Sequence, residues 1–122
     1  MRIKKVKEIS LLKSKIIKVF NFSKIHFKIK EIYIVKIKGK IFRHWRQHIN
    51  CNKILFCSSG ISEIQIFEKN KIKSIILKSG HLINIPKRTI FKFRNLSKKE
   101  SSLLVLSDVT NRNLKTKKKF KF

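Results

Sequence analysis

The chain has 122 residues, a formal net charge of +26 and 42% hydrophobic residues. That length suits one domain with a single hydrophobic core, and the hydrophobic content excludes a disordered chain. No apolar run reaches the roughly 18 residues of a membrane span, and the N-terminus lacks the form of a signal peptide. We therefore expect a cytoplasmic protein with no membrane span.

The charge itself has two interpretations. A chain this basic would be attracted to the phosphates of nucleic acid. However, the charge comes from 26 Lys and only 6 Arg, beside 21 Ile and no Ala, which is the composition expected from an AT-rich genome. Nucleic-acid readers rely on Arg for bidentate contacts, and the lysines are spread along the whole chain. We favour compositional bias and keep nucleic-acid binding as an alternative.

In chain order, residues 1–24 are ambiguous, because their apolar positions fit either a helix face or a pair of strands. Over residues 25–110, apolar and polar residues alternate in short runs with turn signals about ten residues apart, a pattern typical of an all-β barrel or sandwich. The basic residues 111–122 are expected to form a solvated tail. The expected strands lie at residues 32–37, 63–68, 71–77, 81–85, 89–94 and 102–107.

A spaced motif occurs near the end of this region. Gly80 is followed after five residues by Pro86, and Asn95 comes nine positions later. These intervals match the second of two signatures carried by small β-barrels of the cupin type. In that signature a metal-binding His occupies the position that is Phe91 here.

The first cupin signature fits residues 46–60, although its opening glycine is displaced by one position, to Gly39. Side chains at i and i+2 of a strand point to the same side, so Arg46 and His48 would both face the barrel interior. The four metal-ligand positions of the two signatures hold Arg46, His48, Lys53 and Phe91. Only one of these can bind a metal, so the sequence predicts a single small cupin (double-stranded β-helix or jelly-roll) barrel without a metal or another cofactor.

The chain also resembles a narrower group, the WxcM-like family of dTDP-sugar 3,4-ketoisomerases. Residues 43–60 align with the family motif without a gap and keep Arg43, His48 and Gly60. The resemblance implies a metal-independent cupin that acts on dTDP-4-keto-6-deoxyglucose in deoxysugar or surface polysaccharide biosynthesis, and it implies a homodimer. The other similar segments are residues 26–35, 84–87, 95–97 and 103–108.

The chain departs from the family pattern at several positions. The first motif His is Arg46, the family's Gln is Lys53, its Gly is His44, and the Trp after the prolines is Ile90. The Asp-Glu-Arg-Gly loop usual near the N-terminus is not visible. These changes put the activity implied by the resemblance in question.

A 3,4-ketoisomerase removes a proton beside a ketone and returns one at the neighbouring carbon. That chemistry needs a base with a pKa near neutrality in a shielded pocket, and histidine is the usual choice. His48 is the histidine predicted to face the barrel interior, so it is the candidate catalytic residue. If the strand alternation holds, His44 shares its face and partly covers for the His replaced by Arg46.

The candidate substrate-binding residues are mostly cations. Arg43, Arg46 and Lys53 would favour a diphosphate group, would stabilise an enolate and would lower the pKa of His48. Tyr33 joins them as a substrate contact through the family resemblance, as does His44 near the rim. A purely structural role for each stays open. Two other functions also stay open, a degenerate cupin that only binds sugar nucleotide and a basic nucleic-acid-binding protein.

Overall fold

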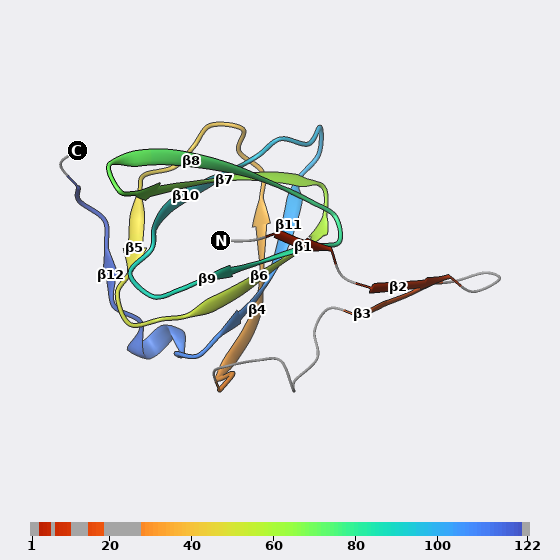
Figure 1. The fold of residues 1–122 in the computed structure, drawn as a ribbon, viewed down its shortest axis with the longest axis horizontal. Helices are drawn as coiled ribbons and strands as arrows, with labels where there is room; N and C mark the ends of the chain where they lie inside the picture. Colours follow the sequence, from red (N-terminus) through yellow and green to blue (C-terminus); the bar gives the residue numbers. More distant parts are fainter. Residues whose placement is uncertain (1–2, 6, 11–14, 19–27, 121–122) are drawn as a thin grey trace.

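The computed structural model describes residues 3–5, 7–10, 15–18 and 28–120, which form two antiparallel five-stranded sheets facing each other and a separate hairpin (Figure 1). In spatial order the first sheet contains β1 (Ile3–Lys5), β9 (His81–Ile85), β6 (Lys53–Ser59), β11 (Ser101–Ser107) and β4 (Glu31–Ile37). The second sheet contains β12 (Thr116–Lys117), β5 (Arg46–His48), β10 (Ile90–Asn95), β7 (Ile61–Glu68) and β8 (Lys71–Lys78). The all-β prediction is confirmed.

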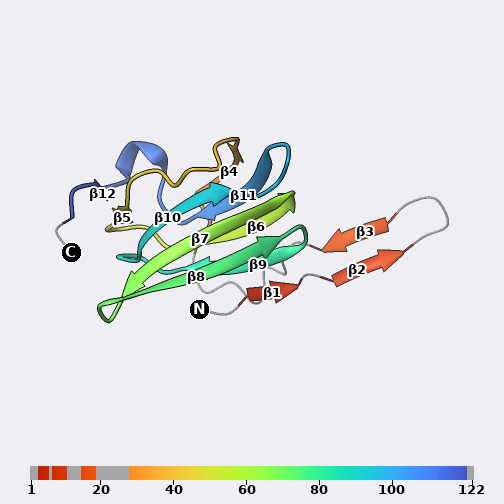
Figure 2. The same ribbon diagram turned by 90° about the horizontal axis from the view of Figure 1, so that it is seen from above.

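The ambiguous N-terminal region forms strands wherever the structure describes it. β1 pairs with β9 and extends the first sheet, with Ile3 opposite Ile83. The hairpin of β2 (Lys7–Ser10) and β3 (Lys15–Lys18) projects away from the two sheets (Figure 2). Of the described residues of this region, β1 extends the first sheet, whereas β2 and β3 form a separate two-stranded sheet.

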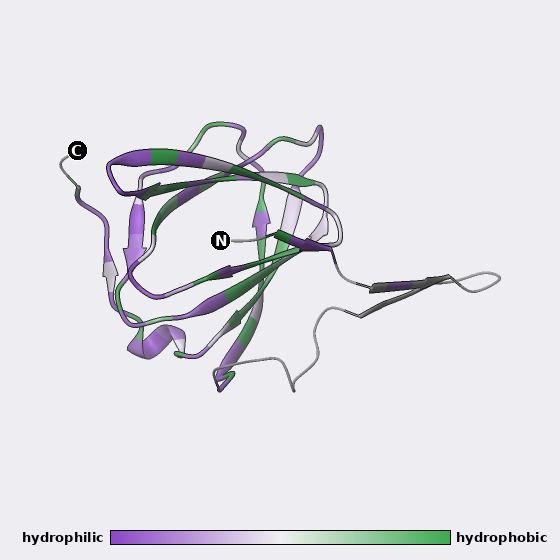
Figure 3. Cartoon of the chain, in the orientation of Figure 1, coloured by the Kyte–Doolittle hydropathy of each residue, from purple (hydrophilic) through white to green (hydrophobic). Residues whose placement is uncertain are grey.

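Alternation along the strands places the core between the two sheets. On β4, Tyr33 and Val35 turn inward and pack against the core, whereas Ile32 and Ile34 are exposed on the other face. Figure 3 shows hydrophobic and hydrophilic residues alternating along the strands in this way. Buried members from both sheets make one cluster that includes Leu55, Cys57, Ile64, Ile66, Leu77, Ile83, Ile85, Phe91, Leu103 and Val105.

The turn between β6 and β7 depends on glycine. Gly60 has a φ of +74°, in the left-handed region that other residues rarely adopt. A Cβ at this position would also lie 2.6 Å from Ser97 Oγ and 2.9 Å from Ser101 Cα. The glycine of the first signature is therefore required by both backbone conformation and space.

The last described residues are mostly exposed, as expected of a solvated tail, but part of the segment forms regular structure. Residues 111–113 form a 3-10 turn, and β12 pairs with β5 so that Thr116 lies opposite His48. The backbone N–H of Ile49 donates to the Lys115 carbonyl at 2.9 Å. Because β5 has only three residues, pairing with β10 on one side and β12 on the other holds this short strand in place. The C-terminal segment thus supports the strand that carries His48.

Candidate active site in the barrel interior

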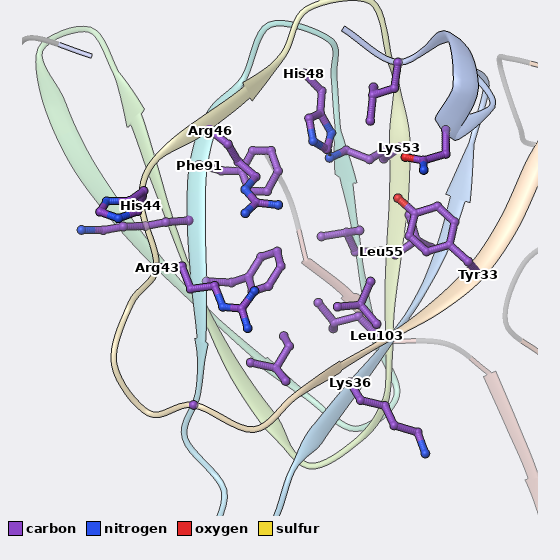
Figure 4. A pocket seen from close by; sticks show the side chains of 18 of the residues that line it. Tyr33, Lys36, Arg43, His44, Arg46, His48, Lys53, Leu55, Phe91 and Leu103 are labelled. Atoms are coloured by element: carbon purple, nitrogen blue, oxygen red, sulfur yellow. Dashed lines mark hydrogen bonds between the residues drawn. The ribbon is translucent and has the colours of Figure 1, made fainter. Parts of the chain in front are cut away.

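A cavity of about 510 Å³ opens between the two sheets. Its size is in the range of pockets that hold small molecules. Strands β4, β6 and β11 of one sheet and β10 and β5 of the other supply its walls (Figure 4). All six candidate site residues predicted from the sequence line it, namely Tyr33, Arg43, His44, Arg46, His48 and Lys53.

The residues at the four metal-ligand positions of the cupin signatures lie close together in this cavity. They are Arg46, His48, Lys53 and Phe91. The His48 ring stands edge-on to the Phe91 ring, with centroids 5.3 Å apart, and Lys53 Nζ lies 4.2 Å from the Phe91 centroid. Arg46 lies opposite Phe91 in the pairing of β5 with β10. Among the described residues, no three His, Cys, Asp or Glu side chains gather as a metal site. The spacing of the two signatures therefore brings these positions together, but their side chains do not make a set of metal ligands.

His48 is held in a buried and electropositive position. Burial, followed by the positive charges of Lys53 and Arg46, lowers the pKa of His48 to about 3. The expected direction of this shift is confirmed. The imidazole is consequently neutral at physiological pH, but its pKa is too low for an efficient base acting alone, because the best catalytic pKa lies near the working pH.

Lys53 is buried more deeply than His48 and has only 3% of its surface exposed. Burial is the main reason that its pKa falls to about 7; the Cys51 thiol opposes this shift and Arg46 adds to it. In the described part of the chain, the ion pairs that carboxylates form do not involve Lys53. Its Nζ instead contacts His48 Nδ1 (Figure 4). Lys53 is thus a partly neutral amine rather than the permanent cation that diphosphate binding would need.

Arg43 and Arg46 are two of the cations that line the cavity. Figure 4 shows both side chains extending into the space between the sheets, with His44 well away from His48. The expectation that His44 shares a strand face with Arg46 and His48 is wrong, because β5 begins only at Arg46. His44 is exposed at the rim of the cavity, in the segment that precedes β5.

Tyr33 faces this cavity from β4, in the opposite sheet from His48. Burial is the main cause that raises the pKa of Tyr33, so the phenol stays protonated and can donate a hydrogen bond. In Figure 4 its hydroxyl is directed toward the side of the cavity that holds Lys53. The structure therefore places Tyr33 where a ligand in the cavity would meet it.

Sequence reasoning missed several residues of the wall. Asn111 and Leu114 line the cavity from the segment expected to be a solvated tail, and Glu31 lines it from the start of β4. The Glu31 carboxylate accepts a hydrogen bond from the backbone N–H of Asn111 at 3.1 Å, which ties the two segments together. No local pattern marks such contacts, because they join residues far apart in the chain. By contrast, the signature spacing could have revealed the Lys53 contact with His48.

Several solved structures with this architecture are of enzymes that act on sugar nucleotides. A 3,4-ketoisomerase from Helicobacter canadensis is 25% identical, with a TM-score of 0.75 over 93% of this chain and 88% of that chain. The sugar 3,4-ketoisomerase QdtA from Thermoanaerobacterium thermosaccharolyticum in complex with TDP is 21% identical, with a TM-score of 0.75 over 89% and 80%. The dTDP-6-deoxy-D-glucose-3,5-epimerase RmlC from Legionella pneumophila is 12% identical, with a TM-score of 0.78 over 95% and 70%. The fold is therefore the cupin-like barrel that the two signatures predict.

A family assignment follows from the sequence match. The FdtA family model, described as WxcM-like, C-terminal, matches residues 1–115. This chain belongs to that family, and the predicted resemblance is confirmed. Among curated proteins no match was found. Within the described residues, no helix is long and apolar enough to cross a membrane.

Proposed function

We propose that this chain is a metal-independent sugar-nucleotide isomerase that interconverts 4-keto and 3-keto forms of a dTDP-linked 6-deoxyhexose. The observation that carries this proposal is a buried, neutral histidine, His48, in a cavity of about 510 Å³ inside a barrel of the WxcM-like family. Similar structures include ketoisomerases in complex with TDP or TDP-4-keto-6-deoxyglucose. We place the reaction in the cytoplasmic synthesis of deoxysugars for surface polysaccharide.

The reaction requires two proton transfers at neighbouring carbons. A base removes the proton from C3, and the electron pair of that bond forms the C3=C4 double bond of an enediolate with negative charge on O4. The proton of the C3 hydroxyl then passes to O4, a proton returns to C4, and C3 becomes the new carbonyl carbon. His48 is the proton-transfer group in this scheme.

Arg46 and Arg43 have the charge that the substrate needs. Their guanidinium groups can bind diphosphate oxygens in pairs, and Arg46 lies close enough to His48 to lower its pKa. A fixed positive charge beside the reacting carbon would also stabilise the enediolate. Tyr33, which stays protonated, is the proposed hydrogen-bond donor to the sugar or the phosphate.

A second candidate function is binding without catalysis. The observation that favours it is Arg46, which occupies the position of the first family His and leaves one histidine beside the reacting carbons. In that case the cavity would hold a sugar nucleotide, but His48 would be an interior histidine in contact with Phe91 and Lys53.

The two candidates separate in one pair of measurements on the full chain. Thermal unfolding with and without dTDP tests binding, and conversion of dTDP-4-keto-6-deoxyglucose tests catalysis. We expect dTDP to raise the Tm, and His48→Asn to reduce turnover by roughly a thousandfold while it still binds dTDP. The matched control is His81→Asn, because His81 lies outside the cavity lining and accepts a hydrogen bond from Lys78 N–H.

Each result has a clear meaning. Turnover that depends on His48 supports the isomerase. Stabilisation by dTDP with no turnover by the unaltered chain supports the binding protein. No stabilisation by dTDP or by any dTDP-sugar contradicts both candidates.

The homodimer implied by the family is also part of this proposal. Ile32 and Ile34 on the edge strand β4 are 55% and 61% exposed, which is unusual for two neighbouring large apolar side chains on one strand face. We expect the mass in solution, measured by light scattering, to be that of two chains and to fall toward one chain in Ile34→Lys. A monomer's mass for the unaltered chain would contradict the proposed homodimer.

A further inference from the structure

Two nitrogen bases, His48 Nδ1 and Lys53 Nζ, are in hydrogen-bond contact inside the barrel. Phe91 covers both, and each has less than a tenth of its surface exposed. They reach this point from different strands, His48 from the end of β5 and Lys53 from the start of β6. Two cationic side chains would repel each other here, so the contact requires that at least one of them be neutral.

The protonation state of Lys53 decides which ring nitrogen of His48 carries the proton. An ammonium has donors only, so a charged Lys53 would force Nδ1 to accept and would leave the imidazole proton on Nε2. A neutral amine has a lone pair and can accept a hydrogen bond from Nδ1–H, which leaves Nε2 unprotonated. Only the second arrangement lets His48 act as a base through Nε2.

Burial and the charge of Arg46 favour the neutral form of Lys53 near physiological pH. Facing the pair are Arg46 from β5, Cys51 from the turn before β6, and Tyr33 and Glu31 on β4 across the cavity. Burial, with a further contribution from Arg46, lowers the pKa of Lys53 to about 7 against the opposing effect of Cys51, whereas the pKa of His48 falls to about 3. A proton is therefore held far better on Lys53 than on an imidazolium at His48.

We propose that Lys53 is a positioning residue that acts through His48, as a neutral amine that accepts Nδ1–H and takes that proton when His48 Nε2 removes a proton from the sugar carbon. In this step the C–H bond breaks and Nε2–H forms, while Nδ1–H breaks and Nζ–H forms. The electron pair of the C–H bond stays in the enediolate, and His48 remains neutral throughout. Reversal of the same steps delivers the proton to the neighbouring carbon, so one histidine and one lysine do the work expected of two histidines. The role in catalysis rests on the proposed function, but the proton linkage within the pair does not.

The linkage can be measured without a substrate. Long-range ¹H–¹⁵N NMR spectra of the imidazoles, recorded from about pH 5 to about pH 9, report which nitrogen carries the proton. His48→Asn identifies the His48 signals. We expect His48 in the unaltered chain to change from the Nε2–H form below about pH 7 to the Nδ1–H form above it, following the titration of Lys53.

Three variants make that measurement specific. Lys53→Arg supplies a permanent cation, so His48 should keep the Nε2–H form at every pH. Lys53→Met removes the titrating group but keeps an apolar stem of similar length, so the change near neutrality should disappear. Lys73→Met, at an exposed lysine on β8, is the matched control, and in this variant His48 should still change form near neutrality. A single His48 form across the range in the unaltered chain, or an unchanged titration in Lys53→Met, would overturn the proposal.

Kinetics then test the role in catalysis. We expect kcat of the unaltered chain to rise with pH through about 7, and Lys53→Arg to lower kcat by roughly a hundredfold with KM changed by less than about threefold. A Lys53→Arg variant with unchanged kcat and an unchanged pH profile would overturn this role. If the unaltered chain converts no sugar nucleotide, the proposed function fails, and the NMR titration still decides whether Lys53 controls the proton on His48.

Discussion

The two ends of the barrel interior both contain buried polar side chains, but of different kinds. At the end where β7, β10 and β11 carry Ser62, Asn95 and Ser101, the groups are neutral and fully hydrogen-bonded. Ser62 Oγ donates to Ser101 Oγ at 2.7 Å, and Asn95 Oδ1 accepts from Ser97 N–H at 2.8 Å. At the other end, His48 and Lys53 are ionisable and contact each other.

This difference distinguishes polar groups typical of a structural network from ionisable groups typical of a functional site. A neutral polar group that finds all its partners can be buried at little cost and fixes the geometry of its surroundings. Burying ionisable bases costs stability. Here burial is the main cause that lowers the pKa of both His48 and Lys53, Arg46 lowers each further, and such shifts are concentrated at functional sites. The Asn95 end therefore has the groups expected of a structural network, and the His48 end has the buried ionisable groups expected of a functional site.

The largest effect should come from breaking the neutral end. Asn95→Leu would leave Ser97 N–H and the Lys99 carbonyl without their side-chain partner in a site that is almost fully buried. We expect a loss of about 3 kcal/mol in the free energy of unfolding, measured in urea, with dTDP affinity retained under folding conditions. A loss below about 1 kcal/mol would show that this network does not hold the barrel closed.

The opposite change is expected at the ionisable end. Lys53→Met removes a buried amine, so we expect stability at about pH 6 to increase by on the order of 2 kcal/mol. Between the folded pKa of about 7 and the unfolded value of 10.5, the unfolded chain binds a proton that the folded chain does not, so the stability of the unaltered chain rises with pH. The advantage of Lys53→Met should therefore shrink from pH 7 toward pH 10. An advantage that does not vary with pH would contradict the assignment of a neutral amine.

A smaller effect is expected at Arg46, which belongs to the same end. Arg46→Gln should weaken dTDP binding by roughly tenfold in calorimetry, because a charged bidentate contact to phosphate is lost. The same change should raise the pKa of both His48 and Lys53, since Arg46 lowers each of them. Arg112→Gln, at an exposed arginine outside the cavity lining, is the control. Equal effects of the two substitutions would assign the binding to overall charge instead of to the cavity.

The smallest effect is expected at the rim. His44 is exposed and precedes β5, so His44→Asn should change kcat by less than about twofold. A loss of more than tenfold in a steady-state assay would show that His44 takes over from the first family His after all.

The sequence predicts the barrel well because alternation and signature spacing are local properties. The i, i+2 relation of Arg46 and His48 and the five-residue step to Lys53 are enough to place three side chains around Phe91. Two features could not be predicted in this way. Asn111 reaches the cavity only through tertiary pairing of β12 with β5, and His44 loses its predicted face because the strand begins two residues later.

Lys53 shows a further limit of sequence reasoning. From the sequence alone, Lys53 is interpreted as a phosphate-binding cation. In the fold it is buried under Phe91 and near Arg46, and its pKa of about 7 means that it loses its proton near neutrality. The pKa of a lysine depends on desolvation, which residue spacing does not give. The spacing predicts where Lys53 lies, and only the fold shows which protonation state that position favours.

The most direct test of the account is hydrogen exchange at the sugar carbon. The full chain is incubated with dTDP-4-keto-6-deoxyglucose in heavy water, and NMR follows deuterium at C4 of the 3-keto product and at C3 of the recovered 4-keto sugar. We predict that the unaltered chain incorporates deuterium and forms the 3-keto sugar, and that His48→Asn does neither. The absence of incorporation by a folded, unaltered chain that binds dTDP would contradict the claim that His48 transfers protons in this cavity.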